Sequence, residues 1–595
     1  MEPAPGAEYT RRLEARRAAC EARERAHRRI GNARVAVALG GVVMVWLAIV
    51  ERALPLWWLL APLALSIALA VAHDRVLRIR DRARRAVQHY EHALARVENR
   101  WMGTGNAGER YIDAAHPYAQ DLDVFGEGSL FQLLSIARTP MGEHILADWL
   151  RAPGATGELR ARQQAVEELR PRLDLREDLA VLGEEARVDV HPEALAAWGE
   201  APSALDSRLL RATATLITLL TLAAAVVWAV AGERVFFLVT LLAAGAFIWR
   251  TRETVNRVIH GVESAAHRLA TLALVLARLE RERFTSPRLA RLRADLEAGG
   301  GPPSARIARL NRLMELLDSR DNLVMRLIGP PLLYTTHLAF AVEGWRRRSG
   351  PALRRWLAAA GEIEALGSLA GYAYEHPADV FPELVEEGPL LEGEGLAHPF
   401  LPEDRAVRNP VSLGGEGARV LVVSGSNMSG KSTLLRTLGV NAVLAQAGGT
   451  VRARRLRISP LQVGASIRIV DSLQAGSSRF YAEITRLRQI VELTGAPRPV
   501  LFLLDEFLHG TNSHDRRIGA EAIVRGLADR GAIGLMTTHD LALAHIAEAL
   551  AGRGANVHFE DRFEDGKLHF DYVMRPGVVR KSNALELMRS VGLEV

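Results

Sequence analysis

A glycine-rich loop in the C-terminal half of the chain has the residue types of a phosphate-binding site. The segment "VVSGSNMSGKSTLLRT" joins a strand-like apolar run to a helical pattern and contains Gly-x-x-x-x-Gly-Lys-Ser, the phosphate-binding loop or P-loop, at 425–432. Consecutive backbone N–H groups in such a loop surround phosphates, and the following helix directs its positive end at them. The residues predicted to contact the nucleotide are Gly425, Ser426, Asn427, Met428, Ser429, Gly430, Lys431, Ser432 and Thr433.

Two side chains of this loop predict ATP and Mg²⁺ as cofactors. The ammonium of Lys431 is expected to reach the outer phosphates and to act in catalysis, and the hydroxyl of Ser432 is expected to ligate Mg²⁺. An ordinary glycine turn before a helix is the alternative interpretation. The strand pattern before the loop and the helical pattern after it favour the nucleotide site.

Two further strand patterns end in side chains suited to phosphate chemistry. "PVLFLLDEF" ends with Asp505 and Glu506, and "GAIGLMTTHD" brings His539 to the end of another strand. The carboxyl ends of parallel strands are where this class of sheet binds ligands. Asp505 is predicted to hold Mg²⁺ through water, Glu506 to polarise the attacking water, and His539 to sense or hold the γ-phosphate. A solvated strand end and a structural histidine are the alternatives.

The composition leaves several partners open. A chain of 595 residues is long enough for several domains, and its formal net charge of +6 is compatible with nucleic acid or an anionic membrane face without establishing either. The single cysteine, Cys20, excludes an intramolecular disulfide framework and a cysteine metal cluster. This cysteine usage fits a reducing compartment.

Two pairs of apolar runs predict two transmembrane helical hairpins. The runs at 35–50 and 53–72 are separated only by a Glu-Arg turn at 51–52, and a second pair across 212–249 is separated by a Glu-Arg turn at 233–234. The shortest runs are at the lower limit of what spans the ~30 Å hydrocarbon core, and flanking residues can extend them. Buried core helices are the alternative interpretation.

Arginine placement predicts the orientation of these hairpins. The segments outside both hairpins are rich in arginine, whereas each turn carries one. By the positive-inside rule the N-terminus, the middle segment and the C-terminal half all face the cytoplasm, which predicts a multi-pass protein of the inner (cytoplasmic) membrane. A further apolar stretch at 322–342 contains Arg326, His337 and two prolines, and it is interpreted as soluble core.

Between and after the hairpins the residue pattern changes once, from helical spacing to alternating strands and helices. Charged and apolar residues follow helical spacing at 74–207 and again from 250, with a break at "GGGPP". From about 395 strand patterns alternate with helical ones, which indicates a parallel α/β sheet.

Four sequence blocks together resemble the ATPase domain of the MutS family of mismatch-repair proteins. They are the loop at 425–433 with its Asn-Met pair, "DSLQAGSSRFYAEI" at 471–484, "DEFLHGTNSHD" at 505–515 and "TTHD" at 537–540. The second block matches the family's signature segment through Asp471, Leu473, Gly476, Ser478, Phe480 and Glu483. "HPFLP" from His398 resembles the entry to that domain, and the tail from Tyr572 resembles its closing segment.

The resemblance extends upstream with departures. "GSLFQLLSIARTPMGEHILADWLRAP" and "GEIEALGSLAGYA" resemble the start and end of the family's helical lever domain, so the matches fall across roughly 120–190 and 360–595. In 1–100, basic helix and membrane hairpin stand where the family carries a mixed α/β domain with a Phe-x-Glu mismatch-reading wedge. The second hairpin stands where the family inserts a DNA clamp.

The resemblance implies an α/β P-loop ATPase domain of ABC type preceded by an all-α lever domain, and the apolar runs add two transmembrane hairpins. The predicted segments are a basic cytoplasmic helix (1–34), hairpin 1 (35–72), the first part of the lever (74–207), hairpin 2 (212–249), the second part of the lever (250–390) and the ATPase domain (395–595).

The function implied is that of a membrane-anchored, homodimeric MutS-like ATPase that moves its levers by binding and hydrolysing ATP. In the family each signature segment approaches the nucleotide of the other subunit, so Ser478 is expected to act in trans. DNA, gripped through its backbone, is the expected ligand, and Arg452, Arg454, Arg455 and Arg457 form either a phosphate contact or a solvated strand edge. The alternatives are an ATP-switched membrane scaffold and a transporter-like ATPase.

Overall fold

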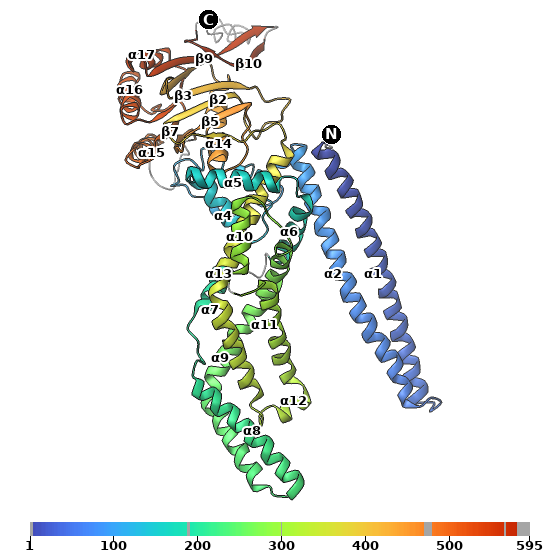
Figure 1. Cartoon of the computed structure of the whole chain (residues 1–595). Helices are drawn as coiled ribbons and strands as arrows, with labels where there is room; N and C mark the ends of the chain where they lie inside the picture. Colours follow the sequence, from blue (N-terminus) through green and yellow to red (C-terminus); the bar gives the residue numbers. More distant parts are fainter. Residues whose placement is uncertain (1–3, 187–190, 299, 469–478, 565–566, 580–595) are drawn as a thin grey trace. The chain divides into compact units, whose positions relative to one another are not determined.

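The computed structural model describes residues 4–186, 191–298, 300–468, 479–564 and 567–579. The chain forms two compact units. Unit 1 comprises Met1–Ser135, Leu150–Leu159 and Gly371–Val595, and unit 2 comprises Ile136–Trp149 and Arg160–Ala370. The fold is mostly helical, and its sheets lie in unit 1 (Figure 1).

A six-stranded sheet forms the centre of unit 1. Its strands are β4 (Val420–Ser424), β6 (Gln462–Ser466), β7 (Val500–Leu504), β8 (Ile533–Thr538), β9 (Gly554–Glu564) and β10 (Lys567–Pro576), in the order β10-β9-β4-β8-β7-β6. All neighbours are parallel except β10, which pairs antiparallel with β9. The three strand patterns predicted around the chemical residues are β4, β7 and β8, and these are adjacent in the sheet.

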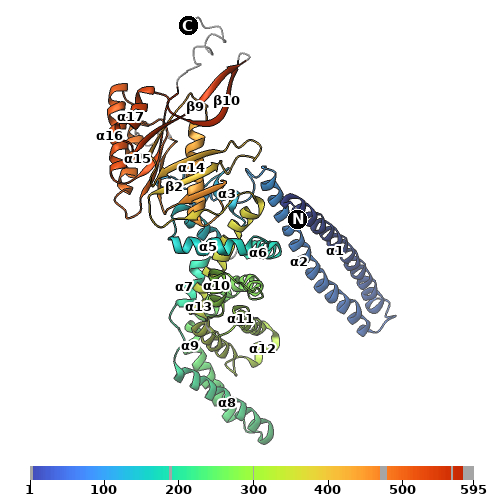
Figure 2. The same cartoon turned by 45° about the horizontal axis from the view of Figure 1, so that its top comes forward.

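Helices cover both faces of this sheet, as Figure 2 shows. They are α14 (Lys431–Ala447) on one face and, on the other, α15 (Arg479–Leu493), α16 (Ser513–Asp529), η5 (Leu541–Ala544) and α17 (His545–Ala549). Every residue of β4, β7 and β8 is buried, as expected for parallel strands packed on both faces. Phe502 packs into the core with α15, α16 and α17, whereas Leu503 lies against Gly439 of α14.

A second sheet is formed mainly by strands that precede β4 in sequence, together with β5, which lies between β4 and β6. It contains β1 (Glu383–Leu384), β2 (Leu390–Leu396), β3 (Asn409–Gly414) and β5 (Arg455–Ile458) in the order β1-β5-β2-β3, with antiparallel pairs on both sides of β2. The sequence predicted only a parallel sheet, beginning near 395. These strands are only two to seven residues long, and β2 carries glycines and charges, so no strand pattern was recognised before 395. The helical part of the segment 250–390 ends at Glu375.

The first two long helices of unit 1 form an antiparallel hairpin. They are α1 (Pro5–Ile49) and α2 (Leu60–Val97), joined through η1 (Leu56–Leu59). At the end away from the turn, the buried guanidinium of Arg96 donates to both oxygens of the buried carboxylate of Glu375, at 2.8 and 2.6 Å, and the hydroxyl of Tyr9 donates to the same carboxylate at 3.3 Å. This contact joins the hairpin to the end of α13. Loss of either partner would leave a buried charge unpaired, which strongly destabilises a protein.

The segment after this hairpin is irregular, although it lies inside the helical domain that the sequence predicted at 74–207. It contains only η2 (Glu109–Tyr111) and the short α3 (Leu130–Leu134). Gly103, Gly105 and Gly108 have positive φ, which ends helical geometry. The carboxylate of Asp121 accepts hydrogen bonds from the backbone N–H groups of Ile467 and Arg468 at 2.7 and 2.8 Å, so this segment packs against the loop that follows β6.

Unit 2 is helical in the part that the structure describes. The helices that lie wholly or partly in it are α4 (Pro140–Arg151), α5 (Thr156–Leu169), α6 (Leu173–Ala186), α7 (Pro192–Glu200), α8 (Arg208–Ala231), α9 (Val235–Leu279), α10 (Pro287–Glu297), α11 (Pro303–Asp318), η3 (Ser319–Asp321), α12 (Leu323–Ile328) and α13 (Tyr334–Glu375). Its core includes Leu269, Leu272, Val275 and Leu276, which recur on one face of α9 and are fully buried.

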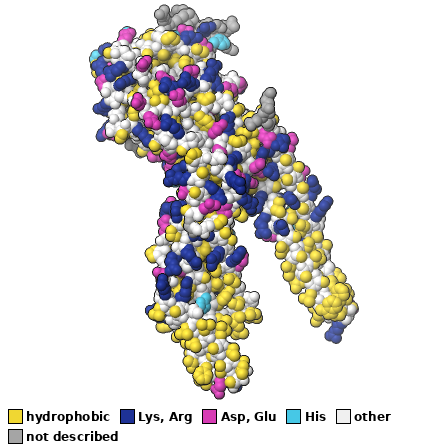
Figure 3. All heavy atoms as spheres, in the orientation of Figure 1, with side chains coloured by type: hydrophobic (Ala, Val, Ile, Leu, Met, Phe, Trp, Pro, Cys, Tyr) yellow, Lys and Arg dark blue, Asp and Glu magenta, His cyan; other side chains and the backbone are white. Residues whose placement is uncertain are grey.

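Four of the described helices are long and apolar enough to cross a membrane, judged by length and composition: α1, the helix formed by η1 and α2, α8 and α9. In the second hairpin, Gly232 adopts a left-handed conformation and ends α8, and α9 begins directly after Arg234. Figure 3 shows apolar side chains gathered at the turn-bearing ends of both hairpins. The exposed members include Val35, Leu39, Val42, Trp46, Leu60, Leu63, Leu216, Leu219, Val226, Phe236, Leu238 and Leu242.

The stretch 322–342, expected to be soluble core, is core only in its second half. Leu338 and Phe340 are buried within α13, but Leu323 and Leu327 of α12 are 82% and 78% exposed. Pro330 and the residue after it interrupt the helical pattern and separate the two parts, because proline cannot continue a helix. The first half therefore presents apolar side chains outward.

Candidate active site

The loop between β4 and α14 requires glycine at both of its ends. Gly425 and Gly430 have φ of +152° and +104°, in the left-handed region that favours glycine. A Cβ on Gly425 would lie 2.8 Å from Ser429 Oγ, and one on Gly430 would lie 3.1 Å from the ring of Tyr572. The two glycines therefore allow a tight turn between a buried strand and a helix N-terminus, the geometry that the sequence predicted.

The ammonium of Lys431 is held beneath this loop. Its side chain is only 4% exposed, and Nζ donates to the carbonyl oxygens of Gly425 and Ser426, each at 2.9 Å. Nζ also forms an ion pair with Oε1 of Glu506 at 3.1 Å. The structure thus brings together the lysine of the loop and the second acid of β7, which lie far apart in the sequence.

The acidic pair at the end of β7 is positioned by a threonine of β8. The hydroxyl of Thr537 donates to Oδ1 of Asp505 at 2.5 Å and accepts from the backbone N–H of Glu506 at 3.0 Å. Thr537 is almost fully buried, so it fixes the carboxylate of Asp505 and the backbone of Glu506 at once. No role was predicted for this residue, which precedes the predicted His539 by two positions.

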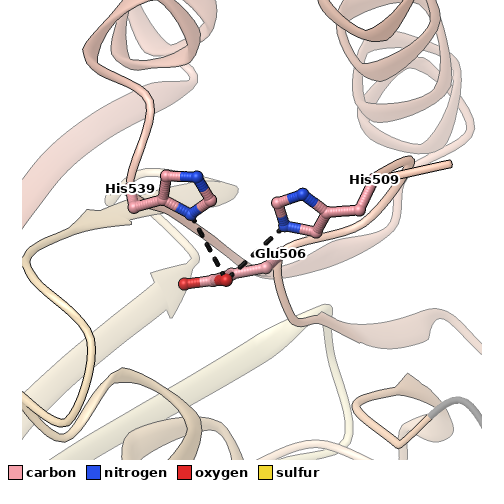
Figure 4. Close-up of side chains that lie close together, drawn as sticks. All are labelled: Glu506, His509 and His539. Atoms are coloured by element: carbon pink, nitrogen blue, oxygen red, sulfur yellow. Dashed lines mark ion pairs between the residues drawn. The ribbon is translucent and has the colours of Figure 1, made fainter. Parts of the chain in front are cut away.

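Two histidines approach the other oxygen of Glu506, as Figure 4 shows. His539 Nδ1 lies 3.3 Å and His509 Nε2 lies 3.5 Å from Glu506 Oε2. Burial alone would raise the pKa of Glu506, but the charge and hydrogen bond of Lys431, with smaller contributions from both histidines, lower it below its ordinary value. Glu506 is therefore ionised at neutral pH.

His509, the histidine nearer to Glu506 in sequence, has a pKa below its ordinary value. Burial lowers the pKa of its imidazole, and the nearby Arg516 adds to this effect, while Glu506 opposes it. The ring of His509 stacks on that of His539 with their centroids 5.1 Å apart and their planes 4° from parallel. No role was predicted for His509, although it lies inside the block "DEFLHGTNSHD".

These residues surround a cavity of about 1010 Å³. The predicted residues that line it are Asn427, Met428, Gly430, Lys431, Ser432, Thr433, Asp505 and Glu506. Gly425, Ser426 and Ser429 form the loop behind this wall, and His539 reaches the site through Glu506. Ser478 lies outside the described residues, as do Asp471, Leu473 and Gly476.

The cavity also has walls that no local pattern indicated. Arg405, Val407, Asn409, Phe559 and Tyr572 line it from segments before and after the predicted blocks. Nothing in the short motifs around these positions marks them as site residues, because a loop before β3 and strands of two different sheets meet at the cavity only in the folded chain. Tyr572 was noted only as the start of a tail resembling the family.

The part of the signature segment that the structure describes supports the turn after the acidic pair. The buried carboxylate of Glu483 on α15 accepts a hydrogen bond from the backbone N–H of Leu508. A Cβ on Gly510 would lie 2.7 Å from Phe480 on the same helix, so glycine is required there by close packing. The family-like residues Phe480, Glu483 and Gly510 therefore position the segment that carries Glu506 and His509.

The residues present fit a nucleotide with a divalent cation. Among the described residues, no hydrogen-bond partner lies near the buried hydroxyls of Ser426 and Ser429. Buried polar atoms without partners are rare in folded proteins and here lie in the loop that would receive phosphates. Ser432 and Asp505, which line the same cavity, supply the oxygen ligands that Mg²⁺ prefers.

Comparison with known proteins connects this site to one family. The model of MutS domain V matches residues 421–594. The chain is 34% identical to DNA mismatch repair protein MutS 2 of Halobacterium salinarum over 42% of its own length and 29% of that protein. It is 36% identical to endonuclease MutS2 of Thermus thermophilus over 33% of its length and 25% of that protein. It is 30% identical to DNA mismatch repair protein MutS of Brevibacillus brevis over 46% of its length and 32% of that protein. The chain thus spans about a third or less of the length of these relatives.

Proposed function

Because the chain is a member of the MutS family, matched over residues 421–594, we propose that it is a membrane-anchored, dimeric P-loop ATPase that acts on DNA. The observation that carries the ATPase activity is the meeting of Lys431 and Glu506, 3.1 Å apart, at one cavity with Asp505 and the loop 425–433. Strand, loop, helix and acidic strand end are the parts with which P-loop enzymes hold ATP and its Mg²⁺.

Each predicted residue has a distinct task in this proposal. Ser432 and Asp505 would hold Mg²⁺, which neutralises charge on the phosphates when bound. Lys431 exchanges its three present acceptors for the outer phosphates. Glu506, freed from Lys431, polarises the attacking water, and His539 at the end of β8 holds or senses the γ-phosphate.

The dimer supplies the part of the site that one chain does not complete. In the family resemblance, the signature segment with Ser478 approaches the nucleotide of the other subunit. The relatives that support this proposal are named for DNA mismatch repair. A monomer is accordingly expected to hydrolyse ATP poorly.

Membrane anchoring is supported by composition and exposure together. The apolar ends of α1, α2, α8 and α9 are exposed on large contiguous surfaces, which soluble monomers rarely show. The leucines of α12, which belongs to the same unit as α8 and α9, are exposed apolar side chains as well. With arginine-rich segments outside both hairpins, the lever and the ATPase domain face the cytoplasm.

The topology predicts which positions an impermeant reagent can reach. In a Cys20→Ser background, Glu51→Cys and Glu233→Cys place single cysteines in the two hairpin turns, and Glu416→Cys places one in the exposed turn between β3 and β4. A maleimide that does not cross membranes is expected to label the two turn cysteines in intact cells and Glu416→Cys only after permeabilisation. Equal labelling of all three cysteines before permeabilisation would contradict the proposal that the two hairpins span the membrane.

The DNA proposal is tested by the steady-state ATPase rate of the detergent-solubilised protein. Duplex and branched DNA are expected to raise the rate, and the stimulation is expected to fall steeply as salt rises, because backbone contacts release counterions. The arginine cluster at 452–457 is not the basis for expecting DNA contacts. Arg452 is buried and pairs with Asp379, and Arg457 pairs with Glu383 and Glu392.

Other outcomes of this assay separate the alternatives. An ATPase rate that no DNA changes would leave the enzyme in place and remove DNA as its ligand, which favours the ATP-switched scaffold. Stimulation by a small solute would favour the transporter-like enzyme. Absence of ATP hydrolysis in the dimer, with Mg²⁺ present, would overturn the proposed function itself.

A further inference from the structure

Three side chains beside the nucleotide cavity bring ligand atoms together. One carboxylate oxygen of Glu506 and one ring nitrogen each of His509 and His539 lie within 4.8 Å of one another. Glu506 follows β7, His509 comes three residues later, and His539 follows β8, so two adjacent strands hold the group in place. In Figure 4 both imidazole rings face the same carboxylate.

The spacing of these atoms matches a metal coordination sphere. Bonds of about 2.0–2.2 Å from Zn²⁺ to imidazole nitrogen and carboxylate oxygen place neighbouring ligand atoms of a tetrahedron roughly 3.4 Å apart. The two distances from Glu506 Oε2 are 3.3 Å to His539 Nδ1 and 3.5 Å to His509 Nε2. Two of the three spacings therefore match the tetrahedral value, and the two ring nitrogens lie within 4.8 Å of each other.

The ligand types select the class of metal. Two imidazoles with one carboxylate form a donor set that zinc enzymes use with one position left open, whereas Mg²⁺ prefers an all-oxygen shell. The group is also reachable, because the side chains of Glu506, His509 and His539 are 26%, 36% and 45% exposed. This site is therefore distinct in chemistry from the Ser432 and Asp505 pair assigned to Mg²⁺.

The two oxygens of Glu506 have separate partners. Oε1 pairs with Lys431, and Oε2 is directed at the two histidines. A metal on Oε2 can bind without displacing Lys431. The bound metal would, however, occupy the Glu506 carboxylate that the proposed reaction needs for activating water. It would also occupy His539, which is proposed to hold or sense the γ-phosphate.

We infer that Glu506, His509 and His539 form a binding site for a divalent transition-metal ion of the zinc class, and that the bound ion inhibits ATP hydrolysis. The inhibition rests on the proposed ATPase function, whereas metal binding does not. A positive ion on Oε2 lowers the basicity of the carboxylate, so Glu506 no longer polarises water. The site would make the enzyme responsive to the free concentration of such metals.

The binding step is tested with Zn²⁺ alone, by calorimetry on the chelator-treated full chain without nucleotide or Mg²⁺. His509→Ala is expected to weaken Zn²⁺ binding by at least about 100-fold, since even partners outside the ligand shell contribute roughly 10–100-fold. The matched control is His514→Ala, which removes an exposed histidine near the start of α16 and should leave binding unchanged. Equal Zn²⁺ affinity in His509→Ala and the unaltered chain would overturn the site.

The inhibition is tested separately, with saturating Mg²⁺ and ATP. Zn²⁺ at its binding concentration is expected to reduce the ATPase rate, a zinc-selective chelator to restore it, and His509→Ala to require a higher Zn²⁺ concentration for the same fractional loss. An ATPase unaffected by Zn²⁺ at full site occupancy would overturn the inhibition. A His509-dependent Zn²⁺ site on a chain that never hydrolyses ATP would instead refute the proposed function and leave the metal site standing.

Discussion

Glu506→Gln is expected to bind ATP with nearly unchanged affinity and to hydrolyse it about 10²–10⁴ times more slowly, the usual contribution of a general base. Glutamine keeps the shape of the side chain and a carbonyl oxygen that can still accept from Lys431, while the backbone N–H at this position keeps its bond to Thr537. What disappears is the negative charge, which the lowered pKa of Glu506 maintains at neutral pH.

Single-turnover hydrolysis and binding of a fluorescent ATP analogue measure the two quantities separately. Glu416→Gln, in the exposed turn between β3 and β4, is the matched control and should affect neither. A Glu506→Gln enzyme with the hydrolysis rate of the unaltered chain would show that another group activates the water. Loss of ATP binding in this variant would instead assign Glu506 a structural task in holding Lys431.

Lys431→Met is expected to weaken ATP binding by roughly 10- to 100-fold or more, because hydrogen bonds from a charged donor contribute about 1.5–3 kcal/mol each. Methionine fills the buried space that the lysine stem occupies, so the effect reports the ammonium and not a cavity. The variant also leaves Glu506 without its cationic partner, and the pKa of that carboxyl should rise towards its ordinary value.

Equilibrium binding of ATP with and without Mg²⁺ measures this loss, and thermal unfolding without nucleotide checks that the domain remains folded. Arg530→Met, at the exposed end of α16, is the control for removing a cation elsewhere in the domain. Unchanged ATP affinity in Lys431→Met would mean that the ammonium keeps its present bonds to the loop carbonyls and never reaches the phosphates.

The elements around the site were predictable wherever a local pattern encodes them. The glycines at 425 and 430, the apolar runs of β4, β7 and β8, and the acids after β7 each satisfy a constraint that neighbouring residues impose. The second sheet and the irregular segment after α2 were missed because no local pattern encodes them. Their short strands and turns depend on partners distant in sequence, such as the bonds from Asp121 to the segment after β6.

Residue types and local spacing were enough to identify a loop that can receive phosphates, acids at one strand end, a histidine at another, and two apolar hairpins flanked by arginine. These follow from residue type and spacing over a few neighbours. Three contacts could be seen only in the folded chain: Lys431 pairs with Glu506, Thr537 bridges the acidic pair, and His509 faces the same carboxylate oxygen as His539. The order of strands in the sheet sets these distances, because parallel neighbours deliver their carboxyl ends to one edge whatever their separation along the chain.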